Sequence, residues 1–136
     1  MVGGTVAFPV PREVAFDYLA DPRNRPQWQA SLTRVENVSG SPDRQTWVDV
    51  TGLRVRPQMG TTEFARPRAW SESGSWRRVS ADLSLRFDAT TRGCRVLYRF
   101  RIRALGPLGL VVSLLAVPMV RADLRRAARI LSSASG

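Results

Sequence analysis

Histidine and lysine are both absent from this 136-residue sequence, and cysteine occurs only once. Without histidine the chain lacks the commonest general base, the commonest metal ligand and the usual partner of a nucleophilic serine or cysteine. The single Cys94 cannot form an intramolecular disulfide, which favours a reducing, cytoplasmic setting. The sequence also contains no glycine-rich phosphate loop. We therefore expect no cofactor, no metal site, and neither redox nor nucleotide chemistry.

The charge of the chain is strongly unbalanced. All 21 basic side chains are arginines, and they oppose 11 acidic ones, for a net charge of +10. Such a surplus attracts nucleic acid, phospholipid headgroups or acidic partners, although scattered charge more often forms only a solvated surface. Length and an apolar content of 43% predict a single domain over residues 1–136. The segment Met1 to Phe8 does not have the pattern of a secretory signal.

The N-terminal third predicts one strand and two short helices. A strand is expected from Val2 to Phe8, followed by a helix from Pro11 to Asp21 whose apolar residues recur on one face. A second helical turn is expected over Pro26 to Ala30, with Trp28 available for the core.

The middle of the chain shows strand signals separated by turns. The expected strands are Leu32–Ser39, Gln45–Gly52, Gln58–Arg66, Ala69–Trp76, Arg78–Ala89 and Cys94–Arg103. In the last two strands, apolar and polar residues alternate with the two-residue period of a sheet that has one solvent-exposed face, and we expect these strands to pair as a hairpin. Asp82 is expected among the arginines of the last strand on the solvent side.

A long helix is predicted from Gly106-Pro107 to about Ser133. Its first half, Leu108 to Val120, is apolar on every side, and Pro118 is expected to kink the helix where the second, arginine-striped half begins. The uncharged segment Ala104 to Val120 is borderline for crossing a bilayer. We favour a buried helix that lies across the sheet, because the amphipathic strands need an apolar cover.

The N-terminal residues carry a family resemblance. Phe8-Pro9-Val10-Pro11-Arg12-Glu13-Val14-Ala15-Phe16-Asp17-Tyr18-Leu19-Ala20-Asp21-Pro22, followed by Pro26-Gln27-Trp28, resembles the start of the polyketide cyclase/dehydrase and lipid-transport proteins of the START-like (SRPBCC) superfamily. The resemblance implies an α+β helix-grip fold, with two short helices after the first strand and a curved seven-stranded antiparallel sheet wrapped around a long C-terminal helix. It also implies a cavity for lipids, sterols or polyketides. No catalytic motif of any subgroup matches, so no catalytic residue is carried over.

Large side chains are the candidate ligand contacts. Aromatic residues and one methionine are expected around the cavity: Trp28, Trp47, Phe64, Trp70, Trp76, Phe87, Tyr98, Phe100 and Met119. The same residues could equally form a close-packed core. Tyr98 and Ser113 would each add a hydroxyl to orient a ligand if their side chains point inward.

Carboxylates are the remaining candidates for acid or base chemistry. Asp49, Glu63 and Glu72 fall within expected strands. We expect Phe64 to point inward, which leaves Glu63 exposed. Glu72 alternates with Trp70 and Trp76, so it is either an exposed carboxylate beside edge tryptophans or a partly buried acid with a raised pKa.

Three functions are compatible with these features. The leading hypothesis is a non-enzymatic protein that binds or transports a hydrophobic small molecule, as a monomer or homodimer, with a basic face that docks on anionic membrane. The alternative is a cofactor-free polyketide cyclase or dehydratase that holds its substrate in a reactive conformation. Nucleic-acid binding is disfavoured, because the aromatic residues are expected to face inward and leave no stacking platform.

Overall fold

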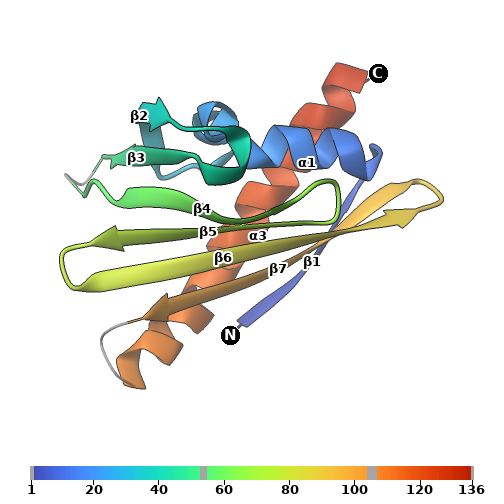
Figure 1. The fold of residues 1–136 in the computed structure, drawn as a ribbon. Helices are drawn as coiled ribbons and strands as arrows, with labels where there is room; N and C mark the ends of the chain where they lie inside the picture. The colour runs from blue at the N-terminus through green and yellow to red at the C-terminus, as the bar shows by residue number, and fades with distance from the viewer. Residues whose placement is uncertain (1, 53–54, 104–106, 136) are drawn as a thin grey trace.

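A curved antiparallel sheet and one long helix dominate the computed structural model, which describes residues 2–52, 55–103 and 107–135 (Figure 1). The sheet has the strand order β1-β7-β6-β5-β4-β3-β2. Its strands are β1 (Val2–Phe8), β2 (Leu32–Ser39), β3 (Thr46–Thr51), β4 (Gln58–Ala65), β5 (Ala69–Trp76), β6 (Val79–Thr90) and β7 (Gly93–Arg103). The helices are α1 (Arg12–Ala20), α2 (Arg25–Trp28) and α3 (Pro107–Ser135), and short 3-10 turns are η1 (Pro22–Asn24) and η2 (Pro42–Arg44).

The predicted α+β helix-grip architecture is confirmed. Every expected strand forms within about two residues of its predicted bounds, and all the neighbouring strands pair antiparallel. In the β6–β7 hairpin, Leu83 lies opposite Phe100 and Leu85 lies opposite Tyr98, so apolar side chains share one face. The alternation of apolar and polar residues therefore determined both the strands and the face that they bury.

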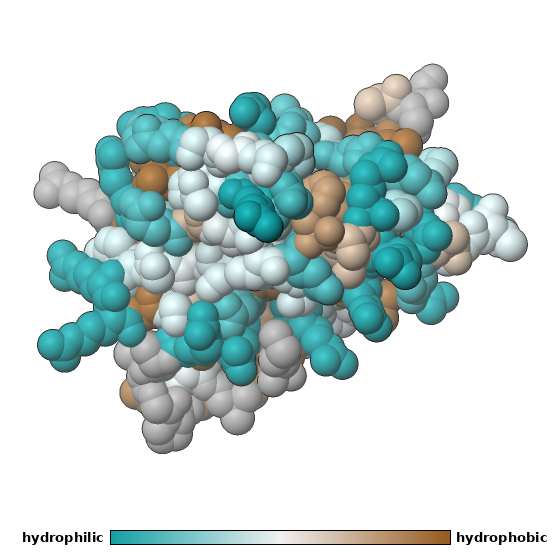
Figure 2. All heavy atoms as spheres, viewed as in Figure 1, coloured by the Kyte–Doolittle hydropathy of each residue, from teal (hydrophilic) through white to brown (hydrophobic). Residues whose placement is uncertain are grey.

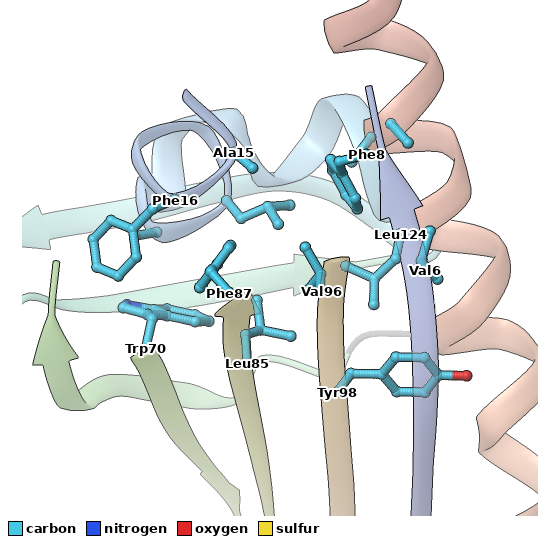
Figure 3. Close-up of a cluster of buried hydrophobic side chains, with 14 of the residues drawn as sticks. Val6, Phe8, Ala15, Phe16, Trp70, Leu85, Phe87, Val96, Tyr98 and Leu124 are labelled. Carbon is cyan, nitrogen blue, oxygen red and sulfur yellow. The ribbon is translucent and has the colours of Figure 1, made fainter. Parts of the chain in front are cut away.

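The buried core lies between α1, α3 and the concave face of the sheet (Figure 3). The Phe16 ring of α1 contacts Phe64 and Phe87, at centroid distances of 5.1 and 5.2 Å. On the β1 side, a Cβ at Gly4 would lie 2.8 Å from the hydroxyl oxygen of Tyr98. Glycine at position 4 thus makes room for a large aromatic side chain beneath the edge strand.

The helix α3 is less buried than expected. Its C-terminal half packs on the core through Leu124, Ala127, Ala128 and Leu131, and α3 contacts the sheet mainly along β1 and β7, which leaves one side of its first half uncovered. Large apolar side chains of that half are therefore exposed: Leu108, Val111, Val112, Leu114, Leu115 and Met119. The prediction of an apolar half buried across the sheet is wrong, and its segment Ala104 to Gly106 lies outside the described residues. No helix among the described residues combines the length and the apolarity needed to cross a membrane.

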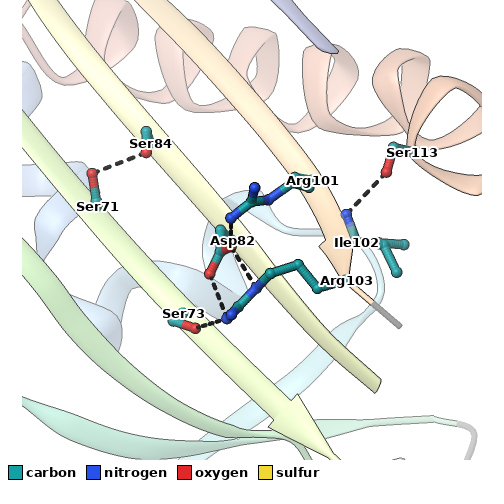
Figure 4. A network of polar contacts seen from close by, with 8 residues as sticks. All are labelled: Ser71, Ser73, Asp82, Ser84, Arg101, Ile102, Arg103 and Ser113. Carbon is teal, nitrogen blue, oxygen red and sulfur yellow. Dashed lines mark hydrogen bonds and ion pairs between the residues drawn. The ribbon is translucent and has the colours of Figure 1, made fainter. Parts of the chain in front are cut away.

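The convex face of the sheet is polar. Figure 2 shows hydrophilic side chains spread over the face turned away from α3. Asp82 forms ion pairs there with Arg101 at 3.1 Å and Arg103 at 2.8 Å, while Ser73 accepts a hydrogen bond from Arg103 (Figure 4). The expected placement of Asp82 among the arginines of β7 is confirmed.

Candidate functional site

An open, mostly apolar pocket lies on the concave face of the sheet. Its volume is about 380 Å³, and its walls come from β3 to β7, the segment before β4 and the end of α2. The lining residues are Gln29, Asp49, Val55, Pro57, Met59, Glu72, Gly74, Ser75, Trp76, Val79, Ser80, Ala81, Asp82, Leu83 and Phe100. A cavity of this size and composition suits an apolar small molecule.

Strand register explains which side chains reach the pocket. Residues directly opposite each other on neighbouring strands lie on the same face of the sheet. The pairs Glu72–Leu83 and Gly74–Ala81 therefore line the same pocket. At Gly74 a Cβ would lie 2.4 Å from the sulfur of Met59. The missing side chain therefore lets Met59 lie flat against β5 and form part of the pocket wall.

Two buried carboxyl groups form a polar end in this apolar pocket. Glu72 on β5 and Asp49 on β3 are 6% and 5% exposed, respectively. Arg25, which is 2% exposed, donates a hydrogen bond from Nη2 to Oε1 of Glu72. Trp47 Nε1 donates to Asp49 Oδ1 at 2.9 Å. The second oxygen of Glu72 and Nε of Arg25 have no hydrogen-bond partner among the described residues.

Burial controls the protonation of both acids. Desolvation is the largest influence on the pKa of Glu72 and raises it, while the nearby Arg25 charge acts in the opposite direction. Burial likewise raises the pKa of Asp49, against the opposing effects of Arg25 and the Trp47 hydrogen bond. Burial therefore favours the neutral form of both acids, and the Arg25 guanidinium, which is hydrogen-bonded to Glu72, opposes that effect.

The arginine of this cluster was not predicted from the sequence. Its guanidinium carbon lies 4.9 Å from the ring centroid of Trp28 and 5.7 Å from that of Trp70. These distances are within the range of a cation–π contact, which helps to hold a charge in a buried position. The local sequence supplies only Trp28 on α2, and it does not separate Arg25 from the other arginines because Glu72 and Trp70 come from the distant strand β5.

The nine predicted ligand-contact residues fall into different environments. Trp76 and Phe100 line the pocket. Five of the others are almost fully buried core residues: Trp28, Trp47, Trp70, Phe87 and Tyr98. Phe64 is partly buried and packs against Phe16. Met119 is 62% exposed on α3 and is absent from the described pocket lining, so its predicted inward position is wrong.

The two predicted orienting hydroxyls do not reach the pocket lining. Ser113 accepts a hydrogen bond from the backbone N–H of Ile102 at 2.9 Å and donates to Gly109 O at 2.7 Å, so it ties α3 to β7. Tyr98 points toward Gly4 instead. Among the predicted carboxylates, Glu63 is exposed as expected and accepts a hydrogen bond from Ser71. For Glu72 the sequence left two alternatives, an exposed carboxylate and a partly buried acid, and in the structure this side chain is buried.

A family model described as polyketide cyclase / dehydrase and lipid transport matches residues 2–136. The chain belongs to this family. No curated protein matches the sequence. Membership agrees with the START-like helix-grip fold, which is a ligand-binding fold.

Solved structures of this polyketide cyclase-like fold resemble the chain over almost its whole length. TTHA0849 from Thermus thermophilus has a TM-score of 0.79 at 18% identity, covering 99% of both chains. The Zhui aromatase/cyclase from Streptomyces sp. R1128 has a TM-score of 0.73 at 14% identity, covering 93% of this chain and 90% of that one. The di-domain aromatase/cyclase StfQ of the steffimycin biosynthetic pathway has a TM-score of 0.79 at 14% identity, with 99% and 52% coverage. At such identities the likeness shows the fold alone.

Proposed function

We propose that this protein binds or transports a hydrophobic small molecule, such as a lipid, a sterol or a polyketide-like compound, in the pocket on the concave face of the sheet. The observation that carries the proposal is a mostly apolar hollow of about 380 Å³ whose lining includes the two buried carboxyl groups of Asp49 and Glu72. Apolar walls supply affinity through the hydrophobic effect, and a few polar groups fix the orientation of a ligand. This function requires no catalytic side chain.

The proposal is tested by native mass spectrometry of the purified protein, followed by organic extraction of any bound molecule. Ala81→Phe places a large ring in the pocket, whereas Ala89→Phe makes the same change at an exposed site of the same strand. We expect a bound molecule in the wild type and in Ala89→Phe, and its loss in Ala81→Phe. An empty wild-type protein that no lipid, sterol or aromatic polyketide stabilises against heat would contradict the proposal.

The second candidate function is a cofactor-free polyketide cyclase or dehydratase. It is favoured by Asp49 and Glu72, two carboxyl groups in the pocket lining whose pKa values are raised by burial. Glu72 would take a proton from the carbon between two carbonyl groups of the substrate. As that carbon bonds to a second carbonyl carbon and closes the ring, Asp49 would protonate the carbonyl oxygen to a hydroxyl. Loss of that hydroxyl and of a proton from the adjacent carbon, together as water, would leave a double bond in the ring.

Catalysis and binding are separated by incubating the protein with a linear poly-β-ketone and analysing the products by mass spectrometry. A cyclase accelerates formation of one ring product, and Asp49→Asn slows that reaction because an amide is a far weaker acid than a carboxyl group. The wild-type and variant proteins of a pure carrier would both leave the spontaneous product mixture unchanged.

Contact with an anionic membrane is the further partner that we propose. One face of α3 carries the exposed apolar residues Val111 and Leu115 in its first half, and Arg125 and Arg129 follow on the same side at helical spacing. An apolar helix face beside arginines, in a chain of net charge +10, complements the acyl boundary and the negative headgroups of a bilayer. Such contact would place the protein where an apolar ligand is stored.

A further inference from the structure

We propose that the pocket takes an amphipathic anion, whose apolar body lies against the pocket walls and whose carboxylate or phosphate lies at the mouth beside Arg77. Arg77 and Arg78 form the turn that joins β5 to β6. This inference rests on the proposed binding function and narrows its ligand class to apolar molecules that end in an acidic head group.

The mouth of the pocket lies at this turn. Along β5 the lining residue Glu72 is buried and Trp76 is half-buried, and along β6 Leu83 is buried and Val79 is half-buried. The exposure of the pocket wall therefore increases toward the turn on both strands. Figure 1 shows that β3 ends and β4 begins at the same end of the sheet.

The guanidinium of Arg77 is available at the mouth. Its carbon Cζ lies 4.7 Å from the ring centroid of Trp76, which is part of the pocket wall. The Arg77 side chain is exposed and has no ion-pair partner among the described residues. Arg56, which lies between two lining residues before β4, is instead paired with Glu36 at 3.5 Å. Arg77 can therefore form an ion pair with the head group of a ligand.

The backbone of the turn is a second observation that favours a role for Arg77. Its φ is 55°, in a region that side chains with a Cβ rarely adopt and that glycine usually fills in a short hairpin turn. Glycine would relieve the strain but would remove the guanidinium from the mouth. Strained backbone of this kind is concentrated at functional sites, including those that hold ligands.

The inner part of the pocket offers no positive charge to a ligand. The described lining contains no arginine, and Arg25 is 2% exposed and already donates a hydrogen bond to Glu72. The carboxyl groups of Asp49 and Glu72 carry no positive charge in either protonation state. An anionic head group brought to this end would lose its water without gaining a cation, so it stays at the mouth and only the apolar body enters.

The experiment compares three compounds with the same ten-carbon chain by isothermal titration calorimetry at neutral pH. Decanoate and decyl phosphate are anions, and decanol is neutral. We expect Arg77→Gln to weaken the binding of at least one anion about fivefold and to change decanol binding by less than about twofold, because an ion pair at a partly exposed site is lost. The anion whose affinity depends on Arg77 identifies the head group as a carboxylate or a phosphate.

Two further variants separate a local ion pair from the general attraction of a basic protein. Arg92→Gln removes the same charge from the turn between β6 and β7, at the other end of β6, and should leave all three affinities within about twofold of the wild type. Arg77→Lys keeps the charge at the mouth and should retain most of the anion affinity. Since Arg77 is exposed, neither change at this position removes a core contact.

The outcomes distinguish this inference from the function on which it rests. Anion binding that Arg77→Gln leaves unchanged, or that Arg92→Gln or Arg77→Lys weakens as much, would overturn the inference. Equal weakening of decanol would also overturn it, because Arg77 would then act only on the shape of the pocket. In each of these cases, decanol binding that Ala81→Phe abolishes would leave the binding function standing. Anion binding that persists in Ala81→Phe would place the anion at another site and overturn the inference. If none of the three compounds binds, the inference and the proposed function fail together.

Discussion

At the scale of single residues, the buried Arg25–Glu72 pair makes the largest electrostatic contribution to the site. Removing one partner of such a pair leaves an uncompensated charge, which costs about 3 to 5 kcal/mol, whereas replacing both by apolar groups costs much less. We expect Arg25→Met to destabilise the protein by that amount, and Arg25→Met with Glu72→Leu to recover part of the loss. Urea unfolding of Arg25→Met, of Glu72→Leu and of the double variant measures the coupling. Additive effects of the two substitutions would show that the pair is not coupled.

The raised pKa of Asp49 makes a testable contribution to the pH dependence of stability. The folded protein retains this proton to a higher pH than the unfolded chain, whose ordinary value is 3.8. The contribution of Asp49 is therefore fully present below that pH and is lost as pH rises through the folded pKa. We expect the free energy of unfolding of the wild type, relative to Asp49→Asn, to fall across this interval.

The informative quantity is the difference in free energy of unfolding between the wild type and Asp49→Asn. Asp17 has a lowered pKa mainly because of its hydrogen bond with Arg66. For Asp82 desolvation is the largest single influence and raises the pKa, but the hydrogen bonds with Arg101 and Ser73 and the charges of Arg101 and Arg103 together lower it. Their contributions to the free energy of unfolding are lost as pH falls, opposite to that of Asp49, but they are common to the wild type and Asp49→Asn. A wild-type minus variant stability that does not change between acidic and neutral pH would contradict the burial argument for Asp49.

The polar end of the pocket was only partly predictable from single residues. Once histidine was absent, Asp49 and Glu72 remained as acids on strands, so the sequence could nominate them. The burial of Glu72 could not be decided, because it depends on an arginine 47 positions away in the chain. Arg25 itself follows Asn24 and precedes Pro26, a setting that carries no signal of burial.

At the scale of elements, the two halves of α3 should respond differently to the same substitution. Leu124 is 0% exposed and packs in the core, whereas Leu115 is 71% exposed. Leu124→Ala should cost about 2 to 5 kcal/mol, and Leu115→Ala should change stability by about 0.5 kcal/mol or less. Urea unfolding compares the two. A large loss at Leu115 would mean that the first half of the helix is covered in solution.

Element types were predictable where the signal is local. The two-residue period of β6 and β7 and the prolines around α1 gave correct elements because each depends on neighbouring residues. The burial of α3 was wrongly predicted since a helix that is apolar on every side fits equally well across a sheet or along its edge. That choice is set by packing against β1 and β7, which no local pattern records.

At the scale of the whole molecule, charge and exposed apolar surface together predict binding to anionic membranes. The chain should bind vesicles of phosphatidylcholine mixed with phosphatidylglycerol and should bind pure phosphatidylcholine weakly, because its net charge of +10 needs negative headgroups. Added salt should weaken the binding by screening. Co-sedimentation measures each case.

The apolar face of α3 should contribute to this binding beyond the charge. Leu115→Gln removes a large apolar side chain from that face and should weaken vesicle binding about tenfold without altering the charge. Val14→Gln is the matched control, because Val14 is an exposed apolar residue that belongs to α1 and not to the apolar face of α3. Equal weakening by both variants, or none by Leu115→Gln, would show that the arginines alone attract the bilayer and that α3 does not enter it.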